Sequence, residues 1–511
     1  MALARVFSIG LFGLSGTVIE VETDISAQLP AFVLVGLPDA SLAEATSRVR
    51  AACTNSGFAF PSKKVVVNLS PASVPKGGAS FDLAIAVSLL GAMQTIETPT
   101  DDAVFFGELG LNGAVRAVPG VLPMMLAARS AGFARAFVPV GNAAEAALVS
   151  GIEVLPVPTL AELVGYLKGV SSLPRIGAVA SALVAQGVAP DLNQVIGQGQ
   201  AVDALIAAAA GGHHISMIGA PGSGKTMLAE RLPSILPKLS LEEALEIAAV
   251  ESINSDGQRE MALNQTPRFV APHHSSSMAA LIGGGSGSPR PGAVSRAHRG
   301  VLFLDEALEF NSAALDALRE PLEAGRVVIN RSAGSALFPA RFQLVLAANP
   351  CPCGLYGVID RDCKCSIPAI RRYSGRLSGP ILDRIDIRLT VQPVSIGAAV
   401  GLGGGLVSSE TAATAVRAAR AAASERLSGT GYLLNSHVPG PVIRRRFKPG
   451  QAVVAELDRM LATGRASMRG YDRCLRLAWT LADLDGATTP NREHVQRAVA
   501  MRGSDDLMGN Q

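Results

Sequence analysis

The chain has 511 residues, of which 48% are hydrophobic and 17% charged, and its formal net charge at pH 7 is +3. At about 150 residues per domain, this length predicts several domains rather than one hydrophobic core. The sequence contains no run of about 18 apolar residues, and glycine and serine interrupt its apolar start, which lacks a small-residue cleavage site. We therefore expect neither a membrane span nor a signal peptide.

Cysteine usage indicates the cellular compartment, and the charge distribution indicates which half of the chain would bind a polyanion. Four of the six cysteines lie between Cys351 and Cys365, whereas a secreted disulfide framework would spread them along the chain, so we expect a cytoplasmic protein. Residues 1–170 hold 10 basic and 13 acidic side chains, and residues 409–511 hold 15 and 10. A polyanionic partner would favour the C-terminal half.

The first 170 residues alternate short β-rich runs with turns, and we predict an α+β domain. Apolar, strand-like runs are present at the start of the chain, in KKVVVNLS (63–70) and in AVFFGELGLNGAVRAV (103–118), where Asn112-Gly113 predicts a two-residue hairpin turn. A helical pattern follows at 122–133 and a strand at 135–140. Residues 171–190 have no strong period and are predicted to be a linker.

From residue 191 to about 394, apolar strands alternate with helical segments, which predicts a parallel sheet covered by helices. The remainder has helical periodicity, most clearly at 410–427, 452–464 and 467–484. We assign a P-loop α/β domain to residues 191–400 and a helical domain to residues 401–511.

The run HHISMIGAPGSGKTMLAERL (213–232) contains a complete Walker A motif between a short strand and a helix. In such a loop, backbone amides and the helix N-terminus surround phosphate oxygens, the lysine reaches the β- and γ-phosphates, and the threonine binds Mg²⁺. The expected ATP-binding residues are Gly219, Ala220, Pro221, Gly222, Ser223, Gly224, Lys225 and Thr226.

Two later strands end in polar residues suited to the same site. GVLFLDE (300–306) ends in Asp305, expected to hold Mg²⁺, and Glu306, expected to orient the attacking water. FQLVLAAN (342–349) ends in Asn349, which could lie between the γ-phosphate and Glu306. The order of the three strands predicts an ATPase.

Three long segments carry a family resemblance: residues 272–307, ANPCPCG (348–354) and RRYSGRLSGPILDRIDI (371–387). They resemble the ComM/YifB family of magnesium-chelatase-like AAA+ ATPases over essentially the whole chain. The resemblance implies a Lon-protease-like N-domain of the ribosomal S5 type, an AAA+ motor with a helix-2 insert and a pre-sensor hairpin, and a helical lid. It also implies DNA branch migration in homologous recombination or natural transformation, by a hexameric ring.

The same resemblance assigns roles to two arginines. Arg384 in LDRID is the expected arginine finger, reaching ATP in a neighbouring subunit. The alternative is a salt bridge with Asp383 or Asp386. Arg469 is the expected second sensor, with Arg473 as the alternate, and an exposed position on a helix face is the competing interpretation.

Two segments could contact DNA in the pore of such a ring. LIGGGSGSPRPG (281–292) is expected to be a flexible loop with Arg290 at its tip, and the alternating run at 326–342 predicts a hairpin with Arg331 beside the turn. Both arginines would contact single-stranded or branched DNA through its backbone, without sequence preference. An ordinary exposed hairpin is the alternative.

The four clustered cysteines are Cys351, Cys353, Cys363 and Cys365, in two C-x-C pairs. Four thiolates could close a tetrahedral structural zinc site, although C-x-C is tighter than the usual C-x₂-C and reduced, unligated thiols are the alternative. For His273 and His274, which have no matched metal ligands, we expect hydrogen-bonding roles in the inserted hairpin.

PKGGASFDLAIA (75–86) resembles the segment that presents the catalytic serine of Lon-type proteases, here Ser80. The segment in which that family carries its lysine, GVLPMMLAARSAG (120–132), contains only Arg129, which cannot act as a base. Lys76 is close in sequence but on the same loop. We therefore expect an inactive protease-like domain, and consider a chelatase-type motor that remodels a protein partner as the main alternative to a DNA motor.

Overall fold

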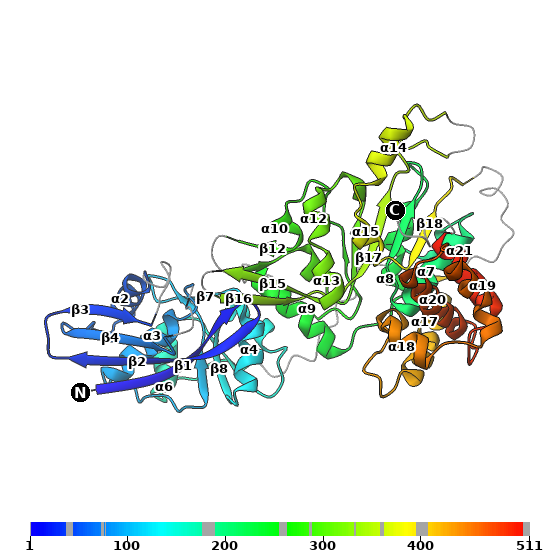
Figure 1. Cartoon of the computed structure of the whole chain (residues 1–511). Coiled ribbons are helices and arrows are strands. Elements are labelled where there is room, and N and C mark those ends of the chain that lie inside the picture. Colours follow the sequence, from blue (N-terminus) through cyan, green and yellow to red (C-terminus); the bar gives the residue numbers. More distant parts are fainter. Residues whose placement is uncertain are drawn as a thin grey trace.

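The structure is a computed structural model that describes residues 2–36, 44–72, 76, 78–175, 190–254, 263–285, 289–331, 334–357, 362–394 and 407–503. Figure 1 shows an N-terminal region at one end, a central α/β region, and a helical C-terminal region packed beside the central one. Most of the predicted linker, residues 176–189, lies outside the described residues.

The N-terminal region is built on a seven-stranded mixed sheet with the order β3-β4-β2-β1-β5-β8-β9. Its strands are β1 (Ala2–Phe12), β2 (Ser15–Ser26), β3 (Ala31–Val35), β4 (Lys64–Ser70), β5 (Ala103–Phe105), β8 (Arg135–Pro139) and β9 (Glu153–Val157). Its helices are α2 (Ala45–Asn55), α3 (Asp82–Ala92), α4 (Val121–Ser130), α5 (Ala143–Ala146) and α6 (Leu160–Leu167), with a 3₁₀ turn, η1 (Val140–Asn142). Every residue of α3 is buried, so the apolar run that follows Ser80 forms the centre of this core.

The central region contains a five-stranded sheet with the order β11-β14-β17-β10-β18, in which every neighbouring pair is parallel. Its strands are β10 (Ile215–Ile218), β11 (Phe269–Val270), β14 (Val301–Leu304), β17 (Gln343–Ala348) and β18 (Ile387–Thr390). All residues of β14 and β17 are buried, as expected for strands covered on both faces. The predicted parallel sheet is confirmed.

Helices and two short hairpins surround this sheet. The helices are α7 (Gly199–Gly211), α8 (Lys225–Ile235), α9 (Leu241–Asn254), α10 (Met278–Leu281), α11 (Ala293–Arg296), α12 (Ser312–Asp316), α13 (Arg319–Ala324), α14 (Ile367–Ser374) and α15 (Gly379–Leu382), with 3₁₀ turns η2 (Leu192–Gln194) and η3 (Ala307–Glu309). One hairpin pairs β12 (Gly283–Gly284) with β13 (Arg290–Pro291), and the other pairs β15 (Arg326–Arg331) with β16 (Gly334–Pro339).

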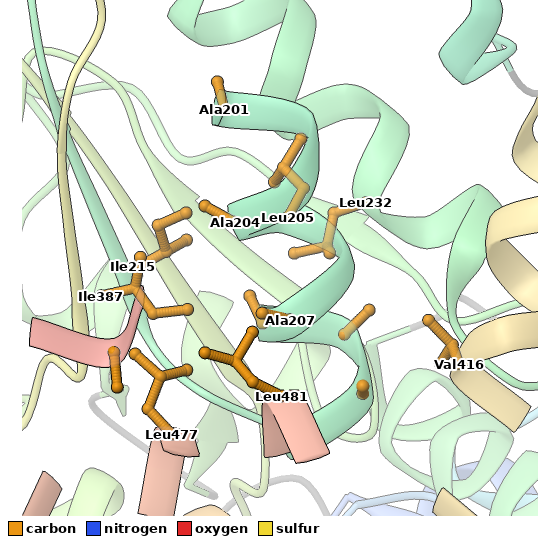
Figure 2. Packing of buried hydrophobic residues seen from close by; sticks show 14 of the residues in the cluster. Ala201, Ala204, Leu205, Ala207, Ile215, Leu232, Ile387, Val416, Leu477 and Leu481 are labelled. Carbon is orange, nitrogen blue, oxygen red and sulfur yellow. The ribbon is translucent and has the colours of Figure 1, made fainter. Parts of the chain in front are cut away.

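The C-terminal region is helical, as predicted, and it shares a core with the central sheet. It comprises α17 (Ser409–Arg426), α18 (Gly440–Arg446), α19 (Gln451–Ala462), α20 (Met468–Leu484) and α21 (Arg492–Arg502), with a 3₁₀ turn, η4 (Asn435–His437). Figure 2 shows Leu477 and Leu481 of α20 beside the alanine-rich helix α7 and near Ile215 and Ile387 of the sheet. Alanine side chains on α7 let the surrounding helices approach closely.

Two contacts between the N-terminal and central regions are formed by described residues. Helix α9 lies against α4, where its alanines are part of an N-terminal hydrophobic cluster, and the Gly120 amide donates a hydrogen bond to the Ser252 carbonyl oxygen (3.0 Å). The Ser252 hydroxyl also donates to the buried Glu145 carboxylate. At the second contact, Phe12 packs on the central core and Gly13 lies beside Ala336 of β16. The hairpin β15–β16 therefore rests on the N-terminal region.

The hairpin of β6 (Glu108–Leu109) and β7 (Val115–Arg116) corrects the predicted two-residue turn. Leu109 pairs with Val115, so the connection runs from Gly110 to Ala114. The Asn112 side-chain oxygen accepts a hydrogen bond from the Ala114 amide (3.2 Å). Asn112 therefore forms an Asx turn with its own backbone, which lengthens the loop.

None of the helices in the described part of the chain is both long and apolar enough to cross a membrane.

A buried ionic network joins the C-terminal helices to the sheet. Asp386, directly before β18, is 3% exposed and accepts hydrogen bonds from His213 (2.8 Å) and Arg473 of α20 (2.6 Å). Burial alone would raise the pKa of Asp386, but the charges of Arg473 and His213 outweigh it and lower that pKa. The ionised carboxylate therefore stabilises the folded chain.

We predict that Asp386→Ala destabilises the contact between the helical region and the sheet by about 3–5 kcal/mol, because it leaves Arg473 buried without its partner. Asp383→Ala, which removes the partner of the exposed Arg469, is the matched control and should cost less than about 1 kcal/mol. Scanning calorimetry of both variants measures the difference.

The pH dependence has a defined sign. Since the folded pKa of Asp386 is lowered, its contribution is present above the unfolded pKa of about 3.9 and is lost as the pH falls below it. Equal melting temperatures for the two variants at neutral pH would contradict this role of Asp386.

Candidate ATP-binding site

Three neighbouring parallel strands bring the predicted motifs to one edge of the sheet. Strand β17 lies between β14 and β10, so the carboxyl ends of all three strands meet. The Walker A loop follows β10, the acidic pair follows β14, and Asn349 follows β17. Crevices at the carboxyl edge of an open parallel sheet are where such folds bind ligands.

The Walker A loop holds its lysine by backbone contacts. Gly224, with φ of +88°, occupies the N-cap of α8, a conformation that suits glycine, and Lys225 begins the helix. The Lys225 ammonium donates hydrogen bonds to the carbonyl oxygens of Gly219 (2.7 Å) and Ala220 (2.9 Å) and lies 3.4 Å from the side-chain oxygen of Asn349. Lys225 and Asn349 are therefore in contact, as expected for two residues of one site.

Burial and the nearby carboxylates shift the pKa of Lys225 in opposite directions. Burial lowers the pKa of Lys225, and the negative charges of Asp305 and Glu306 partly offset this effect. The lysine is only 8% exposed. An ammonium with few water contacts, at the positive end of a helix, favours binding of a phosphate group.

The remaining site residues fit a magnesium–nucleotide complex. The Thr226 hydroxyl donates a hydrogen bond to the Asp305 carboxylate (2.8 Å), so two oxygen ligands suited to Mg²⁺ are adjacent. Glu306 follows with φ of +49°, an unusual conformation for a residue other than glycine, and its carboxylate lies 3.1 Å from Nδ1 of His274. Strained backbone of this kind is concentrated at functional sites.

A cavity of about 280 Å³ opens beside these residues. Thr226, Asp305 and Glu306, which the sequence assigns to the ATP site, line this cavity. The other lining residues were not predicted for the site: Glu230, Phe269, Ala271, Pro272, His273, His274 and Phe303. Phe269 and Phe303 stack with ring centroids 5.5 Å apart. The adjacent histidines in PHHSSS were the sequence feature that could have indicated this wall of the cavity. His274 Nδ1 lies 3.1 Å from the Glu306 carboxylate, and His273 shares a hydrogen bond with the Ser275 hydroxyl (2.8 Å).

The two arginines that the family resemblance singled out lie outside the residues that line this cavity. Arg384, just after α15, forms a salt bridge with Glu323, rather than with Asp383 or Asp386 as the alternative held. Arg469 forms an ion pair with Asp383 and its side chain is 74% exposed.

Arg473, the alternate sensor, differs from Arg469 in its surroundings. It pairs with the buried Asp386, and its side chain is 11% exposed. This arginine belongs to the ionic network between α20 and the sheet.

The two hairpins pack against each other and bring their arginines to the same place. Arg331 donates a hydrogen bond to the Gly285 carbonyl oxygen (2.9 Å), and Gly284, the neighbour of Gly285, pairs with Arg290. Arg290 is therefore an exposed residue of β13 and is not at the tip of its loop, because the strand pairing extends to it. The predicted hairpin with Arg331 beside its turn is confirmed.

The four clustered cysteines converge, and we call them the cysteine cluster. Their sulfur atoms all lie within 4.8 Å of one another, with Cys351 3.3 Å from Cys353 and 3.7 Å from Cys363. Four ligands at about 2.3 Å around a tetrahedral Zn²⁺ lie roughly 3.8 Å apart, so these thiols fit a metal. An amide hydrogen bond from Leu355 lowers the pKa of Cys353 to about 6, whereas burial and hydrogen bonds among the thiols raise the pKa of Cys363 to about 12.

The parallel sheet, the lysine in its loop, and the threonine, acids and asparagine at one edge define the class of protein: a P-loop nucleotide-binding protein. Comparison with known families agrees. The family model described as magnesium chelatase, subunit ChlI, matches residues 191–399, and models for subunit ChlI and for its C-terminal part match residues 21–142 and 407–502.

Full-length relatives refine the assignment. The chain is 48% identical over 503 residues to an uncharacterized protein of Mycobacterium tuberculosis strain H37Rv, covering 98% of this chain and 99% of that protein. It is 40% identical to YifB of Escherichia coli strain K12, over 99% of this chain and 98% of YifB. It is 39% identical to the competence protein ComM of Haemophilus influenzae, over 98% of each. The chain belongs to the ComM/YifB family of magnesium-chelatase-like AAA+ proteins, a class that binds ATP and Mg²⁺.

A shorter match concerns the protease-like segment. Over 54 residues, or 11% of this chain, the sequence is 48% identical to the archaeal Lon protease of Archaeoglobus fulgidus.

We predict that Lys225→Ala abolishes nucleotide binding, whereas Glu306→Gln keeps binding but slows hydrolysis by at least about 10²-fold, because the amide cannot accept a proton. Glu230→Gln is the matched control, since Glu230 lines the same cavity from the second turn of α8 and carries the same kind of side chain as Glu306. Fluorescent-nucleotide titration and phosphate release measure the two steps separately. Hydrolysis at the normal rate in Glu306→Gln would contradict the assignment of Glu306.

Proposed function

We propose that this chain is an ATP-driven, ring-shaped DNA motor that migrates DNA branches in homologous recombination or natural transformation. The site geometry supports ATP hydrolysis, and the similarity to a protein named competence protein ComM supports a role in natural transformation. The observation that carries the DNA part is the contact between two hairpins that brings Arg290 and Arg331 together.

Each residue at the carboxyl edge of the sheet has a separate role in the proposed ATP hydrolysis. The Walker A amides and Lys225, which now donates to the Gly219 carbonyl oxygen, would bind the β- and γ-phosphates. Thr226 and Asp305, which lie side by side, would hold Mg²⁺, and that ion would supply charge neutralisation. Glu306 orients the attacking water and accepts its proton. Asn349, in contact with Lys225, senses the γ-phosphate at the end of the same sheet.

The arginines outside the cavity support assembly into a ring, which we propose to be a hexamer. Arg384 would exchange Glu323 for the γ-phosphate of a neighbouring subunit, where an arginine finger contributes roughly 10³–10⁵ in rate. Arg469 is exposed and held only by Asp383 among its ion pairs in the described chain, so it can move to a phosphate as the second sensor. Arg473 is less suited, because its release would leave Asp386 unpaired.

The N-terminal region serves as a support rather than as a protease. We propose that it has the Lon-like, ribosomal S5-type fold, that α10 and the β12–β13 hairpin form the helix-2 insert, and that residues 401–511 form the lid. Ser80 is 8% exposed, and the ammonium of Lys76, itself 1% exposed, donates to the Pro71 carbonyl oxygen. Neither side chain is arranged as an accessible nucleophile with its base.

A chelatase-type motor that remodels a protein partner is the second candidate, and the match to the magnesium chelatase family model favours it. That function requires no DNA contact at the hairpins. ATP hydrolysis indifferent to single-stranded, duplex and branched DNA would therefore favour the second candidate over the first.

For the cysteine cluster we propose a structural Zn²⁺ site. Four thiolates satisfy the preferred coordination number of structural zinc and leave no open position for catalysis. Zinc also prefers soft sulfur ligands, whereas Mg²⁺ prefers the oxygen ligands of the ATP site.

We predict that Arg331→Ala slows ATP-dependent resolution of a synthetic four-way junction and weakens junction binding about tenfold, since one charged hydrogen bond contributes roughly 1.5 kcal/mol. The slope of log K against log salt should fall by about 1. Arg326→Ala is the matched control, because Arg326 is exposed on the same strand but pairs with Pro339 at the hairpin base. Equal activity of the two variants would remove the hairpin from the DNA-binding surface.

A further inference from the structure

The cysteine cluster is next to the ATP site, and its two halves reach different parts of that site. The first C-x-C pair follows Asn349 after a single proline, since Cys351 is three residues beyond the end of the sensor strand β17. The second pair ends one residue before Ser366, the N-cap of α14. A metal that joins the pairs therefore fixes both segments relative to each other.

The first half of the cluster contacts the Walker A loop. Gly354 has φ of +76°, and a Cβ atom placed on it would lie 2.5 Å from Cδ of Pro221. The Gly354 amide donates to the Cys351 carbonyl oxygen (2.9 Å), and the Tyr356 amide lies 3.4 Å from the Cys351 sulfur. Gly354 is thus held in a tight turn around Cys351, with its backbone against the proline of the phosphate-binding loop.

The same turn is continuous with the sensor. Cys351 is fully buried, and Asn349 contacts the Lys225 ammonium. A displacement of Cys351 is transmitted to Asn349 through one intervening proline, which has few conformations available. The two contacts of the first half thus end on the Walker A loop and on the residue beside its lysine.

The second C-x-C pair is connected through α14 to the segment that follows the acidic residues Asp305 and Glu306. Helix α14 is anchored by Tyr373, which is 7% exposed in the central core. Just beyond α14, Arg376 donates hydrogen bonds to the Leu308 carbonyl oxygen (2.8 Å) and to the Glu309 carboxylate (2.9 Å). Leu308 and Glu309 belong to η3, which directly follows Glu306.

We propose that the cysteine cluster is an allosteric metal site, at which occupancy by a thiophilic divalent cation such as Zn²⁺ raises the affinity of the adjacent P-loop for nucleotide. This inference rests on the proposed zinc site and extends its role from stability to control of ATP binding. With the four thiolates ligated, the turn at Gly354 supports Pro221 and keeps Asn349 beside Lys225. Loss of the metal releases the turn at Gly354 from the second C-x-C pair, and the conformational entropy that this turn regains opposes its contact with Pro221.

Thermodynamic linkage adds a second, independent consequence. If the metal raises nucleotide affinity by some factor, the nucleotide must raise metal affinity by the same factor. The coupling can therefore be measured from either site, and one measurement checks the other.

The first test separates the contact from the metal with a pair of glycine variants. Gly354→Ala should keep one metal ion per chain but weaken binding of a fluorescent ATP analogue about tenfold, because the added methyl group displaces Pro221. Gly357→Ala is the matched control: its φ of +74° imposes similar backbone strain, but a Cβ there meets no atom within 4 Å. Normal nucleotide affinity in Gly354→Ala, or equal weakening in Gly357→Ala, would overturn the proposed contact.

The second test uses the unmodified full chain. Removal of the metal with a chelator under reducing conditions should weaken nucleotide binding by about the same factor, and added Zn²⁺ should restore it. Saturating nucleotide should in turn slow metal loss to the chelator. A chain that binds no metal, or whose nucleotide affinity is the same with and without metal, would overturn the inference.

Lys225→Ala distinguishes the two proposals, because it should abolish nucleotide binding while metal content stays at one per chain. Neither glycine test nor chelation involves DNA, so they remain decisive even if DNA fails to stimulate hydrolysis.

Discussion

The parallel pairing of β14, β17 and β10 is the constraint on which the rest of the molecule depends. In a parallel sheet all strands end at the same edge, so three segments far apart in sequence deliver Lys225, Glu306 and Asn349 to one place. Without this register the Walker A loop would remain a glycine-rich turn with no acids opposite it. Burial of both faces explains why these strands consist almost entirely of apolar residues.

The helical C-terminal region is attached at the opposite edge of the sheet, where the amino ends of the strands lie. His213 lies two residues before β10 and Asp386 directly precedes β18, and together with Arg473 they join α20 to the amino ends of the strands. Nucleotide is expected at the carboxyl edge and the helical attachment lies at the amino edge. A change in strand position on ATP binding would thus reach the helical C-terminal region through a buried charge network, in which small displacements are costly.

Local pattern was sufficient to predict the parallel sheet, the helical C-terminal region and the β15–β16 hairpin, because apolar periodicity and polar residues at strand ends are properties of short segments. Contacts across long sequence distances were not predicted. Examples are the pairing of Arg384 with Glu323, the proximity of His274 to Glu306, and the contact of Gly354 with Pro221. Each depends on how separate elements pack, and no spacing in the sequence encodes it.

The most direct test of the proposed motor is the steady-state rate of ATP hydrolysis by the intact chain, measured without DNA and with saturating four-way junction, single-stranded DNA or duplex at the same ionic strength. The proposed DNA motor predicts hydrolysis that depends on Mg²⁺ and is stimulated several-fold by branched or single-stranded DNA, with stimulation falling as salt rises. Hydrolysis at one rate under all of these conditions would contradict it.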